Sequence, residues 1–406
     1  MLAQSHRKDA FIEFIKSLLA APFVLHMRDD AQRRLQHYGE VMDSLSQMIH
    51  EHRELAARED PRGKRRVSRL ARLVPEIGDF FTELDMRSAL LEYNAAYGFA
   101  ERSRVAPSFN DVRLVLNIAQ LQAITPALRL MTFDGDCTLY EDGANFDRSD
   151  PLVGQMIQLL RFGIKVALVT AAGYPSAPEK YTERLAGLQQ AMLDAPDLTD
   201  DQCRSLYVLG GECSYLFQFT GKADGCRLRE LAREEFMTSE MLQWSDADIK
   251  ALMDAAHACI SSFVQRLNIN ATIIRKPRSV GMLPRKTRHD LDVGSGRRAS
   301  RRVTAELLDE LALELADLDT GPISLPYTAF NGGSDIWVDV GSKQIGVQLL
   351  QAYLSTLPEQ TLHVGDQFLR IGNDFATRRA CTTLWVTDPA ETSHMLELLL
   401  SCRKSN

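Results

Sequence analysis

Residues 130–140 have the sequence LMTFDGDCTLY, in which a short apolar run ends in two carboxylates, Asp134 and Asp136. Such a run predicts a buried strand that carries both acids at its carboxyl end. The backbone amides of the turn that follows can form a cradle for an anion. An aspartate in this position can attack phosphorus and form an aspartyl-phosphate, and a second carboxylate can protonate the leaving oxygen. Ordinary loop turns and calcium sites also contain Asp-Gly-Asp, so the motif gains weight only from its surroundings.

Further short apolar runs follow at residues 164–170, 206–210, 361–365 and 381–386, and residues 151–162 form a helical pattern between the first two strands. Short strands that alternate with helices and end in polar residues predict an α/β fold with a parallel, Rossmann-like sheet. In such sheets the site lies beyond the carboxyl ends of the strands.

Three more residues are expected at that edge of the sheet. Thr170 ends the second run and offers a hydroxyl and a backbone N–H to a phosphate oxygen. Lys343 precedes a helix, and Asp366 follows Gly365, which lets the chain turn sharply after its strand. Each has a structural alternative on its own: a strand-terminal threonine, a surface lysine, and an acid that caps a helix or binds a metal.

The 406 residues predict two or three structural units. Residues 1–125 show helical periodicity and no strand pattern, and a break in the first helix is expected at Pro22. The sheet domain is expected in two parts, residues 126–220 and 340–406. Residues 221–339 mix helical stretches, predicted at 228–235, 246–267 and 305–318, with strand-like pieces and are interpreted as an α+β insertion.

Composition excludes several classes of protein. With 47 Lys and Arg against 54 Asp and Glu, the net charge is −7, which gives no reason to expect a nucleic-acid or anionic-membrane partner. No apolar run approaches 18 residues, so no membrane span is expected. Seven cysteines without a CxxC pair indicate reduced thiols and a cytoplasmic protein. Basic residues 62–73 could bind a phosphorylated effector or form a solvated helix face, and basic residues 285–302 are expected to form a surface loop.

The order of these elements resembles the haloacid-dehalogenase (HAD) phosphatase superfamily: an acidic loop, a threonine, an insertion, a lysine, then Gly-Asp. An insertion between the threonine and the lysine resembles its C2-type cap. Longer strings are similar to the IMP-specific 5′-nucleotidase family, from the first helix to the final strand. They are DAFIEFIKSLLAAPFVLH (9–26), TFDGDCTLYEDG (132–143), VLGGECSYLF (208–217), DIWVDVGSK (335–343) and HVGDQFLRIGNDF (363–375).

The resemblance implies Mg²⁺-dependent hydrolysis of IMP to inosine and phosphate, a step of purine nucleotide metabolism. Asp134 would be the nucleophile and a metal ligand. Asp136 would be the general acid and base, would contact the substrate, and would give the metal its backbone carbonyl. Asp366 would complete the protein ligands. Thr170 and Lys343 would hold the phosphoryl oxygens.

Further expectations concern the nucleoside and the assembly. Asp142 and Asp335 are candidates to face the ribose or the base, and Tyr174, Phe217 and Phe330 are candidate stacking rings. The resemblance also implies a homo-oligomer, a tetramer, and ATP is a candidate effector acting through the N-terminal helices.

Three alternatives stay open on the sequence alone. One is another C2-capped HAD phosphatase that acts on a sugar phosphate or a different mononucleotide. Another is a catalytically silent nucleotide-sensing protein with the same fold. The third is a phosphomutase, which would release no phosphate.

Overall fold

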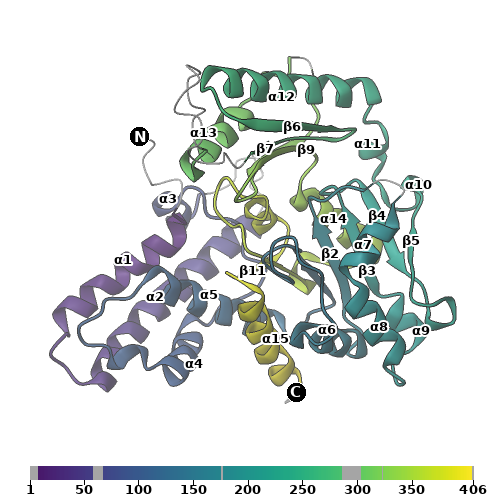
Figure 1. Ribbon diagram of the computed structural model, residues 1–406. Helices are drawn as coiled ribbons and strands as arrows, with labels where there is room; N and C mark the ends of the chain where they lie inside the picture. The colour runs from purple at the N-terminus through teal and green to yellow at the C-terminus, as the bar shows by residue number, and fades with distance from the viewer. Residues whose placement is uncertain (1–7, 58–66, 175–176, 286–302, 322, 405–406) are drawn as a thin grey trace, which may run out of the picture.

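The computed structural model describes residues 8–57, 67–174, 177–285, 303–321 and 323–404. It is a mixed α/β protein with two sheets and a group of N-terminal helices (Figure 1). The larger sheet lies in the body of the molecule, the smaller sheet lies above it, and the N-terminal helices lie to one side. The α/β class with a mainly parallel sheet, predicted from the alternation of strands and helices, is confirmed.

The larger sheet has seven strands in the order β11-β10-β1-β2-β3-β4-β5. Strand β1 pairs in parallel with β2 on one side and with β10 on the other. Since the chain order reverses at β1, the crevice beyond its carboxyl end is where ligands bind in open α/β sheets. The parallel strands are β1 (Leu130–Phe133), β2 (Lys165–Thr170), β3 (Leu206–Gly210), β10 (Thr361–Gly365) and β11 (Thr382–Trp385), and the antiparallel ones are β4 (Tyr215–Phe219) and β5 (Leu228–Glu230).

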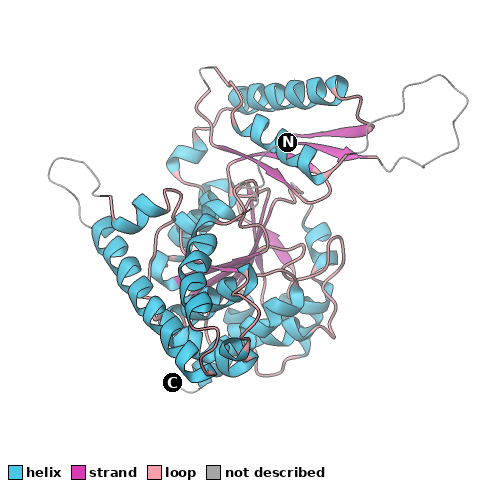
Figure 2. Cartoon of the chain, turned by 90° about the vertical axis from the view of Figure 1, so that its left-hand side faces the viewer, coloured by secondary structure: helices cyan, strands magenta, loops and turns pink. Residues whose placement is uncertain are grey.

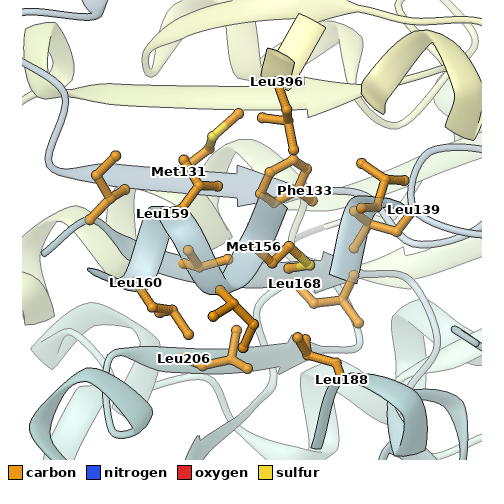
Figure 3. Packing of buried hydrophobic residues seen from close by; sticks show 14 of the residues in the cluster. Met131, Phe133, Leu139, Met156, Leu159, Leu160, Leu168, Leu188, Leu206 and Leu396 are labelled. Carbon is orange, nitrogen blue, oxygen red and sulfur yellow. The ribbon is translucent and has the colours of Figure 1, made fainter. Parts of the chain in front are cut away.

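Helices cover both faces of this sheet because its strands are apolar on both sides. On one face, side chains of α6 (Pro151–Arg161) and α15 (Pro389–Lys404) pack against β1, β2 and β3, as Figure 3 shows. On the other face, α14 (Lys343–Leu354) packs against β2. Residues of β1 alternate between the two cores: Met131 and Phe133 lie in the first, and Leu130 in the second.

The N-terminal helices have a hydrophobic core of their own and pack on the edge of the larger sheet through α5 and β11. The Arg113 guanidinium lies 2.8 Å from the Glu391 carboxylate, and Arg378 forms an ion pair with Asp9. These helices are α1 (Ala10–Leu25), α2 (Ala31–Ala57), α3 (Arg69–Leu73), α4 (Met86–Tyr97) and α5 (Phe109–Ile124), with the 3-10 helix η2 (Phe99–Glu101).

The smaller sheet has four antiparallel strands in the order β6-β7-β9-β8, with two helices on one face (Figure 2). In β9, Ile336 and Val338 point into the core under those helices, so Trp337 and Asp339 lie on the opposite face. The strands are β6 (Ala271–Lys276), β7 (Ser279–Pro284), β8 (Tyr327–Asn331) and β9 (Ile336–Val340), and the helices are α12 (Asp246–Arg266) and α13 (Ala305–Ala316).

Short helices complete the described chain. They are α7 (Pro178–Arg184), α8 (Ala186–Asp194), α9 (Asp200–Cys203), α10 (Arg233–Phe236), α11 (Ser239–Leu242) and the 3-10 helices η3 (Lys222–Asp224), η4 (Pro358–Gln360) and η5 (Phe375–Arg379). No helix among the described residues is long and apolar enough to cross a membrane.

Two local predictions are wrong. Helix α1 does not break at Pro22 but continues to Leu25: the proline lacks one N–H donor, but the turn after it still closes through the His26 N–H and the Pro22 carbonyl at 2.9 Å. Residues 228–235, predicted as a helix, form β5 and then α10 instead. Pairing of β5 with β4 overrides the charged, helix-favouring composition, and it places residues 228–230 of the predicted insertion in the larger sheet.

Only part of each basic segment lies among the residues that the structure describes. Of residues 62–73, positions 62–66 lie outside the described residues, and Arg69–Leu73 form α3. Of residues 285–302, all but Arg285 lie outside them.

Candidate active site

The loop after β1 is built by a tight turn. The Asp134 N–H donates to the Val364 carbonyl at 2.8 Å, which extends the pairing of β1 with β10 by one residue. The Leu139 N–H then folds back onto the Gly135 carbonyl at 2.8 Å. A Cβ at position 135 would lie 2.5 Å from the Tyr140 hydroxyl, so a side chain there would have to displace the buried Tyr140 ring. The turn leaves Asp134 buried at its base.

Lys343, the first residue of α14, lies beneath this loop and is fully buried. Its Nζ lies 2.7 Å from Asp134 Oδ1 and 2.7 Å from Asp374 Oδ1. Burial alone lowers the pKa of Lys343, but the two carboxylates outweigh burial and raise it above its usual value. The ammonium is therefore held charged between the acids of two distant loops.

Asp374 is saturated with hydrogen-bond donors. Its Oδ1 also accepts from His363 Nε2 at 3.0 Å, and its Oδ2 accepts from the Gln367 backbone N–H at 2.9 Å. Thr132 Oγ1 lies 2.8 Å from the other ring nitrogen of His363 and fixes the ring. Burial raises the pKa of Asp374, but Lys343 and His363 lower it by more. The net pKa lies below its usual value, so the carboxylate stays ionised. Asp374 therefore orients Lys343.

Acidic side chains from the first and last motifs meet around one point. Asp134, Asp366 and Asp374 each offer an oxygen within 4.8 Å of the others. Asp366 Oδ1 is buried and has no hydrogen-bond partner among the described residues. Burial, then the charges of Asp134 and Asp374, raise the pKa of Asp366 to about 8. An all-oxygen donor set with an unpaired, buried oxygen fits a small hard cation such as Mg²⁺.

A cavity of about 420 Å³ opens above these acids, between the two sheets. Its volume suits a mononucleotide, since small-molecule sites span about 300 to 1,000 Å³. Thr170 lines it, and because its Oγ1 accepts from the Ala172 N–H at 3.1 Å, the hydroxyl hydrogen is left to donate. The larger sheet contributes Asp134, Asp136, Thr170, Asp366 and Asn373, and the smaller sheet and its loops contribute Lys276, Phe330, Asp335 and Trp337.

The smaller sheet presents an aromatic wall with a cation to this cavity. Lys276 Nζ lies 4.8 Å from the centre of the Trp337 ring and 5.7 Å from that of Tyr174. A Cβ at Gly281 would lie 2.4 Å from the Trp337 ring, so glycine lets the indole lie against β7. Burial lowers the pKa of Lys276.

The other predicted carboxylates line the rim of the same cavity. Asp136 Oδ1 accepts from the Gly143 N–H at 3.1 Å and lies 3.6 Å from the Arg184 guanidinium. Asp142 is exposed, and Asp335 is half-buried just before β9. Burial raises the pKa of Asp335, and the charges of Asp142 and Asp136 raise it as well. A hydrogen bond from Trp337 lowers it, but the net pKa stays above its usual value.

One of the three predicted stacking rings is misplaced. Tyr174 and Phe330 line the cavity, but Phe217 on β4 is fully buried in the core, packed beside Tyr181. The prediction about Phe217 is wrong because an aromatic ring on a strand beside an apolar helix packs into the core.

Sequence reasoning missed five residues that the structure places near the site: His363, Glu212, Lys276, Arg184 and Trp337. His363 could have been recognised from the sequence, because it is a polar residue in the middle of the apolar run TLHVG at 361–365. Glu212, whose Oε1 accepts from Asn373 Nδ2 at 3.1 Å, is similarly a charged residue in an otherwise uncharged segment. Lys276 and Arg184 carry no such signal, because only tertiary packing brings them to the cavity.

Comparison with known proteins gives a uniform result. A family model described as IMP-specific 5′-nucleotidase matches residues 2–396. The IMP-specific 5′-nucleotidase 1 of Eremothecium gossypii is 41% identical over 414 residues, which cover 98% of this chain and 96% of that protein. The IMP-specific 5′-nucleotidase 1 of Schizosaccharomyces pombe is 40% identical over 415 residues, which cover 99% and 97%.

Solved structures agree with the sequence relatives. An IMP-bound mutant of Plasmodium falciparum IMP-nucleotidase superposes with a TM-score of 0.83 at 30% identity, covering 97% of this chain and 94% of that one. The ATP-bound form of the same protein gives a TM-score of 0.80 at 31% identity, covering 97% and 85%.

Proposed function

The chain belongs to the IMP-specific 5′-nucleotidase family, with a HAD-like fold, and from that membership we propose that it hydrolyses IMP through an aspartyl-phosphate on Asp134. The family activity makes it a phosphomonoester hydrolase. The observation that carries the mechanism is the convergence of Asp134, Asp366 and Lys343 at the floor of one nucleotide-sized cavity.

In the proposed reaction an Asp134 oxygen attacks the phosphorus of IMP and the bond to the ribose O5′ breaks. Asp136, at the rim of the cavity, gives its proton to the leaving O5′ and releases inosine. Asp136 then takes a proton from a water molecule that attacks the phosphorus of the aspartyl-phosphate. Cleavage of the acyl phosphate releases phosphate and restores the Asp134 carboxylate.

Charge balance supports this assignment. Asp134 and Asp366, when ionised, and the phosphate monoester together bring a charge of about −4. Mg²⁺ would be held by Asp134, Asp366 and the Asp136 backbone carbonyl, and when bound it neutralises charge on the carboxylates and phosphoryl oxygens. Lys343 adds one further positive charge directly at Asp134, and the Thr170 hydroxyl donates to a phosphoryl oxygen.

The nucleoside is assigned to the side of the cavity formed by the smaller sheet, which acts as a C2-type cap. Trp337 and Tyr174 offer ring faces to the purine. Asp142 and Asp335 are assigned to the ribose or the base, because both line the cavity and neither belongs to the cluster of buried acids.

A phosphate-release panel tests the proposal. The protein is incubated with IMP, AMP, GMP, nicotinamide mononucleotide and hexose phosphates, with Mg²⁺ and with EDTA. We expect IMP to be preferred, EDTA to abolish release and added Mg²⁺ to restore it. Equal turnover of hexose phosphates would support the broader phosphatase alternative, and activity indifferent to chelation would reject the metal site.

ATP is proposed as an effector, since a relative has been solved with ATP bound. Titration of ATP against IMP turnover at limiting and saturating IMP separates the alternatives. An effector changes the rate at saturating IMP, whereas a competitor at the active site acts only at limiting IMP.

The chain is also proposed to form a cytoplasmic homotetramer through its N-terminal helices. The support is an apolar tip on α1, where Val24 and Leu25 are 67% and 76% exposed. Light scattering after size exclusion should give a mass near four chains, and Val24→Glu with Leu25→Glu should reduce it. Cell fractionation tests the compartment.

A further inference from the structure

Glu212 is a buried acid for which the proposed reaction has no use. It follows β3 in a left-handed turn, with φ of 62°, and its side chain is fully buried. Its backbone N–H donates to the Thr170 carbonyl at 3.0 Å, and its own carbonyl lies so close to Gly346 of α14 that a Cβ there would be 2.3 Å away. The turn that carries Glu212 therefore touches two of the segments that build the phosphate end of the cavity.

The Glu212 carboxyl group has one hydrogen bond in the described part of the chain. Oε1 accepts from Asn373 Nδ2 at 3.1 Å, across 161 positions of sequence, and Oε2 has no partner. A buried acid is costly to the fold, so an apolar residue would be expected here if the position served packing alone.

Asn373 links this acid to the cavity. It is 5% exposed, lines the cavity near Asp134 and Asp366, and directly precedes the Asp374 that orients Lys343. Its Nδ2 donates to Glu212, and its other polar atom, Oδ1, has no partner within the described residues. An amide carbonyl accepts hydrogen bonds only, so it suits a water molecule and not an anionic phosphoryl oxygen.

We propose that Glu212 is a positioning residue that fixes the Asn373 amide with its carbonyl toward water ligands of the bound cation. This inference rests on the proposed function and adds an outer partner to its metal site. Outer partners that orient the ligand shell in this way are worth about 10- to 100-fold in metal affinity or activity.

Electrostatics agree with the geometry. Burial raises the pKa of Glu212 to about 8. The charge of Lys343 lowers this pKa, and the charges of Asp339 and Asp134 raise it. A carboxyl group that is largely protonated at neutral pH leaves the unpartnered Oε2 neutral, so the acid adds little negative charge beside the phosphate.

The test compares Glu212→Ala, Glu212→Gln and Asn373→Ala after removal of metal with EDTA. Calorimetric titration with Mg²⁺ should give a Kd about 10- to 100-fold weaker for Glu212→Ala and Asn373→Ala. Glu212→Gln should stay near wild type, because the glutamine Oε1 can accept the same hydrogen bond from Asn373. The double variant should be no worse than either single one, since both act through one contact.

Kinetics provide a second measurement. At saturating Mg²⁺, kcat for IMP should fall in the two alanine variants while KM stays within about threefold of wild type. Ser214→Ala is the matched control, since Ser214 is buried in the same turn and its hydroxyl has no hydrogen-bond partner in the described structure. It should change neither Kd nor kcat.

Two results would overturn the inference while wild-type IMP turnover remains intact. One is Asn373→Ala with unchanged Mg²⁺ affinity and kcat, which would still count if Glu212→Ala failed to fold. The other is Glu212→Gln impaired as strongly as Glu212→Ala at an unchanged melting temperature. Failure of the proposed function would instead show in the wild type, as absence of metal-dependent phosphate release.

Discussion

The two sheets supply the cavity in different ways. The seven-stranded sheet places its polar groups in loops just beyond strand ends, where short contiguous motifs carry them. The four-stranded sheet uses side chains on its strands, such as Lys276 and Trp337, chosen by the alternation of the two faces. Chemistry is thus encoded in compact motifs, whereas the wall proposed to meet the nucleoside is dispersed over residues 276–337 and cannot be recognised without the fold.

Replacing the proposed nucleophile should have the largest effect. Asp134→Asn keeps the size and most hydrogen bonds of the side chain but removes the attacking carboxylate. We expect kcat for IMP to fall by at least about 10⁴-fold, as for nucleophiles removed from other enzymes. Phosphate release and circular dichroism on the same sample would measure it, and a folded variant with substantial turnover would refute the role of Asp134.

Replacing the buried lysine should affect both stability and turnover. Lys343→Met leaves the buried Asp134 carboxylate without its charge partner and removes one of the hydrogen-bond donors of Asp374, a change that costs about 3 to 5 kcal/mol. Urea unfolding should show a lower free energy of unfolding, together with loss of phosphate release. Lys165→Met is the control, since Lys165 is only partly buried and donates to the backbone carbonyl of Leu354. A Lys343 variant as stable as the wild type would contradict the buried contacts of Lys343 with Asp134 and Asp374.

A substitution on the wall of the smaller sheet should separate substrate binding from chemistry. Trp337→Leu removes the ring beside Lys276, and a lost aromatic contact of about 1.4 kcal/mol raises KM for IMP about tenfold. Turnover of a small phosphate ester without a purine should be unchanged. Trp244→Leu is the matched control, because Trp244 lies in the hollow beside Ile345 and not in this cavity. A fall in kcat with unchanged KM would assign Trp337 to the chemistry.

The smallest effect concerns pH. The folded-state pKa of Glu212, about 8, lies above its ordinary value of 4.5, so between these values the folded protein binds more protons than the unfolded chain. Stability is therefore lost as pH rises through this interval. Glu212→Gln removes that loss, so its gain in melting temperature over wild type should grow from pH 5 to pH 9. A constant difference across the range would show that the acid is not buried as described.

Sequence reasoning located the larger sheet well because its parallel strands are short apolar runs bounded by polar residues. It missed β4 and β7, which follow tight turns, and misassigned β5, whose charged residues favour a helix until pairing with β4 decides otherwise. Pairing between strands depends on their neighbours in the sheet, so the local periodicity of hydrophobic residues does not predict it.

The candidate site divides in the same manner. Asp134, Thr170 and Asp366 were predicted from strand ends and Lys343 from its place before a helix, and the fold brings them to one edge. The contact of Lys343 with two carboxylates, the support of Asp374 by His363, and the Glu212–Asn373 pair depend on side-chain packing between segments distant in sequence, so spacing alone carried no sign of them.

The central place of β1 has a consequence for biosynthesis. Thr132 on β1 lies beside Leu362 on β10, yet the two are separated by 230 positions of chain. A ribosome therefore releases β1 long before the strand that covers its second edge, and that edge stays open to wrong partners meanwhile. The acids converge only after residues 366 and 374 have emerged, so the nascent polypeptide lacks the complete acidic cluster until then.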